Sequence, residues 1–137
     1  MSGRKATREE TGAARRVASA GARATYTVEQ ANRALPLVRR IVDDLVAAYR
    51  DWQRTVHAFE YAASASRAEA PDSEAERLQR EAQQLAGDID GFVRELADLG
   101  VECKGFDRGL VDFPSERDGR AVYLCWMRGE PAVAHWH

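Results

Sequence analysis

The sequence has few cysteines, which can cross-link a small protein, and few prolines, which interrupt helices and strands. Its 137 residues include two cysteines and four prolines. The pair Cys103 and Cys125 is too small for a disulfide framework, and no C-x-x-C spacing indicates a redox centre or a zinc ribbon. The cysteine content therefore favours reduced thiols in a cytoplasmic protein.

Long apolar runs are also missing. Charged residues interrupt every apolar stretch well before the length of about 20 residues that a membrane helix needs. The first residues carry positive charge but no apolar run of signal-peptide length. We therefore expect a cytoplasmic protein with no membrane partner.

Recognisable catalytic motifs are absent as well. The sequence contains no G-x-S-x-G, no phosphate-binding P-loop and no dinucleotide fingerprint. Enzymatic activity is therefore left undecided by the sequence, with the balance against it.

Charge is unevenly distributed along the chain. The formal net charge is −2, but residues 1–24 hold six basic and two acidic side chains, so this segment carries +4 and the remainder −6. The segment has nothing periodic to bury, which predicts a flexible basic leader. A basic leader can bind nucleic acid by counterion release, yet a solvated extension is the favoured interpretation.

Two apolar stripes at helical spacing dominate the middle of the chain. The first consists of Leu35, Val38, Val42, Leu45, Tyr49, Trp52, Val56 and Phe59, and the second of Leu78, Ala82, Leu85, Ile89, Phe92, Leu96 and Leu99. Alternating steps of three and four residues keep each stripe on one helical face. Because only a short polar break separates them, the sequence predicts an antiparallel, coiled-coil-like helical hairpin over residues 27–99.

Local signals mark the ends of these helices. Thr27 and Gln30 form a capping box at the start of the first helix. Pro36 cannot donate to the preceding turn, so we expect a short entry helix followed by a long helix with Pro36 in its first turn. Gly100 suits the left-handed position that closes the second helix.

After Gly100 the apolar period changes from that of a helix to that of a strand. Short strands are expected at residues 101–104, 110–113, 121–127 and 132–137, with turns at residues 105–109, 114–119 and 128–131. The apolar stripes widen at the open end of the hairpin, where these strands emerge. The sequence therefore predicts one α+β domain over residues 25–137, with a small antiparallel β-meander (residues 101–137) packed on the open end.

The last hairpin also allows a register to be predicted. A turn centred on Gly129 and Glu130 sets Cys125 opposite Ala134, Leu124 opposite His135 and Val122 opposite His137.

Short motifs in the chain resemble a known family. They are G-V-E-C-K from Gly100, R-G-L-V-D-F-P from Arg108, D-G-R-A-V-Y-L-C-W from Asp118, G-E-P from Gly129 and W-H at Trp136. Together with the Y-T-V-E-Q-A-N-R-A-L-P stretch from Tyr26, they resemble the bacterial domain-of-unknown-function 2203 family over roughly residues 26–137. The resemblance implies a bacterial cytoplasmic setting and supplies no established activity.

Candidate metal ligands lie in the predicted strands. His135 and His137 are two residues apart, so a strand places both imidazoles on one face. The meander brings thiols and carboxylates towards them, which gives the candidate ligands His135, His137, Cys103, Cys125, Asp112 and Glu130. These residue types suit zinc or another divalent transition metal, although the spacing matches no defined zinc finger.

Two other functional interpretations remain open. Lys104, Asp107, Arg108, Asp112, Glu130 and His137 are candidates for a polar cleft with general acid-base chemistry, but no nucleophile accompanies them. Gly87 and Gly91, on the outer side of the second helix, indicate close approach of another backbone, either the sheet or a second subunit.

We favour a non-enzymatic interaction or scaffold module that forms a homodimer, uses no cofactor and binds an unidentified protein partner. The alternative is a metal-binding protein or a metal-dependent enzyme that uses the candidate ligands.

Overall fold

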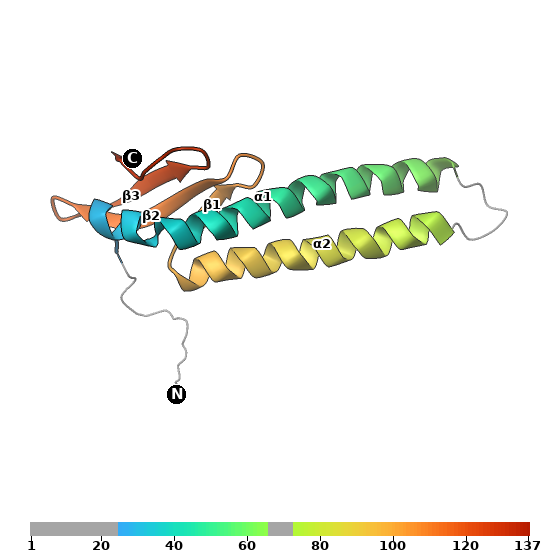
Figure 1. The fold of residues 1–137 in the computed structure, drawn as a ribbon, viewed down its shortest axis with the longest axis horizontal. Coiled ribbons are helices and arrows are strands. Elements are labelled where there is room, and N and C mark those ends of the chain that lie inside the picture. Colours follow the sequence, from blue (N-terminus) through green and yellow to red (C-terminus); the bar gives the residue numbers. More distant parts are fainter. Residues whose placement is uncertain (1–24, 66–72) are drawn as a thin grey trace, which may run out of the picture.

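The computed structural model describes residues 25–65 and 73–137. Within these residues the elements are α1 (Val28–Ala65), α2 (Ser73–Asp98), β1 (Glu102–Gly105), β2 (Leu110–Arg117), β3 (Arg120–Met127) and β4 (His135–Trp136). The two helices lie side by side as a hairpin, and the strands form a sheet at its open end (Figure 1). The predicted α+β class is confirmed, while the expected leader at residues 1–24 lies outside the described residues.

The predicted helix ends are confirmed by hydrogen bonds. Thr27 N–H donates to Gln30 Oε1 (2.9 Å), and Gln30 N–H donates to Thr27 Oγ1 (3.0 Å), which completes the capping box. At the other end, Gly100 has a φ of 78°, and Val101 N–H donates to Leu96 O (2.9 Å). This is the Schellman geometry, and the burial of both Leu96 and Val101 supplies its apolar contact.

The prediction of a separate entry helix before Pro36 is wrong, because α1 runs through Pro36 without a break. The proline costs about 3 kcal/mol in a helix interior. Ala31, Leu35 and Val38 flank it and are at most 3% exposed. Since each large aliphatic side chain contributes about 1.5–3 kcal/mol on burial, their packing on the sheet outweighs the cost of the proline.

The sheet is antiparallel throughout, in the order β1-β2-β3-β4. β2 is longer than predicted, because residues 114–117 continue the strand instead of forming a turn. Pro114 fits because it lies beyond Asp112, which pairs with the first residue of β1, so β1 needs no hydrogen bond from it, and its carbonyl accepts the Tyr26 N–H (2.8 Å). The turn itself is Asp118-Gly119, with φ values of 53° and 76°, which suit a two-residue β-hairpin turn.

The predicted register of the last hairpin is wrong by one residue. Leu124 pairs with Trp136 and Cys125 with His135, so β4 is limited to two residues of the expected strand. The cause is Asn32 of α1, whose Oδ1 accepts the Val133 N–H (2.8 Å) and whose Nδ2 donates to Val133 O (3.0 Å). Asn32 thus takes Val133 out of the ladder and lengthens the loop.

The core lies between the sheet and the open end of the hairpin. It comprises Ala31, Leu35, Val38, Ile41, Val42, Leu45, Val46, Leu96, Val101, Val111, Phe113, Leu124, Trp126 and Val133. Leu37, one of the residues that widen the apolar stripe, is nevertheless 43% exposed. In the described residues, no helix is both long and apolar enough to cross a membrane.

Candidate metal centre

One row of side chains crosses the outer face of the sheet. The register sets Asp112 of β2 opposite Cys125 of β3, and Cys125 opposite His135 of β4. Because side chains alternate along a strand, this row faces away from Val111, Leu124 and the helices. His137 follows on the same face, two residues after His135.

Three ligand atoms converge on this face. The Oδ1 of Asp112 lies 3.0 Å from Nε2 of His137, and these two atoms and the Cys125 Sγ all lie within 4.8 Å of one another. The three residues come from two neighbouring strands and the end of the chain just after β4. Their positions are set by the backbone, because Tyr123 and His137 exchange two backbone hydrogen bonds (2.8 and 3.2 Å).

Burial differs sharply within this cluster. The Asp112 side chain is 4% exposed, whereas that of His137 is 57% exposed. A buried carboxylate loses its hydration and needs a compensating positive group. Among the described residues, the side chain that pairs with this carboxylate is the ring of His137, which carries charge only when protonated.

The thiol of Cys125 responds to the same surroundings. Burial raises the pKa of Cys125, and the negative charges of Asp112 and Glu130 raise it further. The free thiol is therefore held in its protonated form. A bound cation would reverse this effect, because it favours the thiolate and offsets both carboxylates.

The other three predicted ligands contribute no atom to this cluster. Cys103 lies on the core side of the sheet, opposite Val111, where burial raises the pKa of its thiol. Glu130 closes the turn after β3, where its Oε1 accepts the Met127 N–H (2.8 Å). His135 is exposed, and its ring is not among the three converging ligand atoms.

The predicted polar cleft is assembled only in part. Of its six residues, Asp112 and His137 are the pair joined by a hydrogen bond in the described chain. Lys104 pairs instead with Glu102 (3.3 Å), a neighbour on its own strand. The six residues include no thiol or hydroxyl, and the thiol beside the Asp112–His137 pair is that of Cys125, which belongs to the cluster described above.

Asn32 is the residue that sequence reasoning left without a role. It holds the loop before β4 by two hydrogen bonds to Val133 and so sets where His135 and His137 lie. A local signal was present, because Asn32 is a polar residue one helical turn before Leu35 on the apolar face of α1. Its partner is 101 residues away, which no local pattern indicates.

Fold and site together define a helical hairpin joined to a small antiparallel sheet, with an oxygen, a nitrogen and a sulfur atom gathered on the outer face of that sheet. A family model described as an uncharacterized conserved protein (DUF2203) matches residues 24–137. The chain therefore belongs to this family, as its motifs predicted. No curated protein and no solved structure matches it significantly.

Proposed function

We propose that this protein binds a divalent transition metal ion through Asp112, Cys125 and His137, and that zinc is the best match. The observation that carries the proposal is the convergence of three different ligand atoms within 4.8 Å around a buried carboxylate. The metal-binding protein, which was the alternative in the sequence analysis, is therefore placed ahead of the interaction or scaffold module.

The spacing suits a small tetrahedral ion. Zinc binds oxygen and nitrogen at about 2.0–2.2 Å, so two such ligands on a tetrahedral ion are separated by about 3.4 Å. The Asp112 and His137 atoms, at 3.0 Å, are close to that value. The Cys125 sulfur lies within 4.8 Å of both atoms, and with a zinc–sulfur bond of about 2.3 Å it would lie about 3.6 Å from them on a tetrahedral ion.

The chemistry of the ligands narrows the choice of metal. A thiolate and an imidazole prefer zinc and other borderline or soft transition ions, whereas magnesium and calcium prefer oxygen ligands. The cation would also supply the positive charge that the buried Asp112 carboxylate lacks whenever His137 is neutral.

Elemental analysis of protein purified without an affinity tag or added metal tests the proposal. We expect about one metal ion per chain, lost in Cys125→Ser and in Asp112→Asn. Cys103→Ser is the matched control, because this cysteine lies on the opposite face of the sheet. Wild-type protein that neither contains metal nor binds added zinc in calorimetry would contradict the proposal.

A homodimer is the second candidate function, and the helix α2 supports it. Among the described residues, nothing lies within 4 Å of a Cβ built on Gly87 or Gly91, so the sheet does not approach them. Each glycine costs about 1 kcal/mol relative to alanine in a helix. Close packing of a second copy against this face would account for that cost.

Sedimentation equilibrium tests the dimer. Gly91→Leu places a large side chain where the chain leaves open space, so we expect the variant to fold and to shift from dimer to monomer. Ala86→Leu controls for added apolar surface, because Ala86 is exposed on α2 but lies at least about 100° around the helix from both glycines. A monomeric wild-type protein at micromolar concentration would rule the dimer out.

A further inference from the structure

We infer that His135 is the fourth ligand of the proposed metal, so that the ion is a structural clamp that fastens β4 to β2 and β3. The inference rests on the proposed function and gives the site a specific role. A closed site of four protein ligands has no free position for a substrate, unlike a catalytic site.

The register brings His135 close to the cluster. Cys125 and His135 are directly opposed residues on β3 and β4. Directly opposed residues have Cβ atoms about 4.5–5.5 Å apart and share one face of the sheet. A rotation of the His135 side chain therefore carries a ring nitrogen towards the Cys125 sulfur without any movement of the backbone.

The remaining candidates are committed elsewhere. Glu130 uses Oε1 to hold the Met127 N–H, and Cys103 packs against the core. His135, in contrast, is exposed, and its side chain forms no hydrogen bond or ion pair with the described residues. It is the one residue of the predicted ligand set that is both close and free to turn.

The local structure around β4 shows why a clamp is useful. β4 contributes two residues to the ladder, and residues 134–137 are all exposed. So short an edge strand contributes little stability of its own. Ligands at His135 and His137, on either side of Trp136, would tie both ends of β4 to Asp112 and Cys125.

Cobalt substitution tests the inference in the full-length protein. We expect Co²⁺ added to the wild type to give the intense visible absorption of a four-coordinate ion, with a sulfur-to-cobalt charge-transfer band, and to be unaffected by azide. In His135→Ala we expect at least about 100-fold weaker Co²⁺ binding, a larger loss than replacement of an outer-shell partner causes. The remaining complex should absorb more weakly and respond to azide, because water takes the vacant position.

Amide hydrogen exchange supplies a second readout. In the wild type, Zn²⁺ should slow the exchange of the His137 N–H, which donates to Tyr123 O (2.8 Å). In His135→Ala at saturating Zn²⁺ this slowing should be largely lost. His57→Ala is the matched control for both experiments, because His57 is an exposed histidine on α1.

The outcomes separate the two proposals. Cobalt binding with a charge-transfer band that is unchanged in His135→Ala, or a wild-type complex that takes up azide, overturns the fourth ligand while leaving the metal centre intact. Wild-type protein that binds no cobalt overturns the metal centre and the clamp together.

Discussion

At the end of the hairpin that the sheet covers, α1 buries seven core side chains between Ala31 and Val46. Beyond Ala48, the buried side chains of the described hairpin away from the sheet are Thr55, Ala75 and Leu78, each still 8% exposed. The same heptad-like pattern therefore produces a fully buried core where the sheet covers the two helices, and a partly exposed helix–helix interface where it does not.

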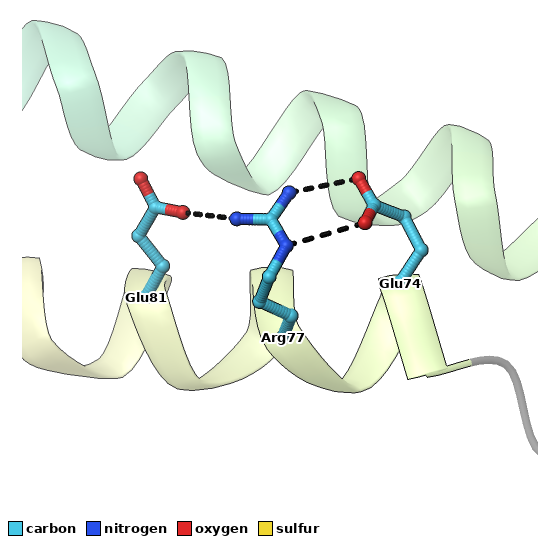
Figure 2. A network of polar contacts seen from close by, with 3 residues as sticks. All are labelled: Glu74, Arg77 and Glu81. Atoms are coloured by element: carbon cyan, nitrogen blue, oxygen red, sulfur yellow. Dashed lines mark hydrogen bonds and ion pairs between the residues drawn. The ribbon is translucent and has the colours of Figure 1, made fainter.

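The uncovered end relies on weaker interactions. An open groove of about 450 Å³ lies between the helices, lined by Thr55, Leu78 and Leu85 among others. On α2, Arg77 bridges Glu74 (2.8 and 3.2 Å) and Glu81 (3.2 Å), and Figure 2 shows the three side chains in a row along the helix. Exposed ion pairs of this kind contribute little stability. The periodicity of the apolar stripes therefore predicts that the two helices pair. How deeply their side chains are buried depends on whether the sheet also covers the helix pair.

The largest difference in stability loss is expected between two Leu→Ala substitutions on the apolar stripe of α2, one at each end of the hairpin. Leu96→Ala removes a side chain with 0% exposure and should destabilise the protein by about 3–5 kcal/mol. Leu85→Ala, on the same helix but half-buried beside the groove, should cost only about 1–2 kcal/mol. Urea denaturation measures both. Equal losses would mean that the two ends are equally well packed.

A methyl group added at a glycine probes how closely the sheet and α1 approach. At Gly109 (φ 72°) a Cβ would lie 2.8 Å from Val42 Cγ1 and 2.8 Å from Arg128 Cβ. Gly109→Ala should therefore cost about 2–4 kcal/mol, from backbone strain and overpacking together. Gly119→Ala has a similar φ of 76° but open space, so it should cost about 1–2 kcal/mol. A similar cost at both positions in thermal melts would contradict close packing at Gly109.

A partly buried polar contact lies at the covered end, in contrast to the exposed ion pairs at the other end. The Tyr26 hydroxyl donates to Leu99 O, and burial raises the pKa of Tyr26. Since the folded-state pKa exceeds the unfolded value of about 10, this stabilisation is complete below pH 10 and is lost as pH rises through the folded-state pKa. Tyr26→Phe should cost about 1 kcal/mol at neutral pH and reduce the alkaline loss of stability. Identical alkaline unfolding in both proteins would exclude this role for Tyr26.

The smallest effect is expected at the uncovered end. The guanidinium of Arg77 lowers the pKa of Glu74, but the side chains of both residues are more than half exposed. Arg77→Ala should therefore leave the urea midpoint unchanged within error at physiological salt. A clear loss of stability would show that the ion pairs, and not the seam alone, hold this end together.

Most of the helical architecture follows from local sequence. The stripes, the capping box at Thr27 and the Schellman glycine at position 100 are encoded within a few residues of where they act. Pro36 misled the prediction because its cost is local, whereas the burial that offsets it comes from strands more than 70 residues later in the chain.

The sheet is less predictable for the same reason. The Asp118-Gly119 dipeptide is a strong signal for a two-residue hairpin turn, but Pro114 was interpreted as the start of a loop. The register of β4 depends on Asn32, a contact that no pattern near His135 reveals. Of the candidate ligands, Asp112, Cys125 and His137 converge. Cys103 lies on the other face of the sheet because of the strand register, and Glu130 accepts a hydrogen bond within its own turn, and neither arrangement can be read from the sequence.

The pairing of Asn32 with Val133 also has a consequence for biosynthesis. Asn32 of α1 is synthesised about 100 residues before Val133, its hydrogen-bond partner in the loop before β4. At a synthesis rate of about 5–20 residues per second, this interval lasts several seconds or more. During this time the nascent hairpin exposes the apolar face that β2 and β3 will later cover. We expect this interval to be the stage at which the newly made chain is most exposed to aggregation and most dependent on chaperones.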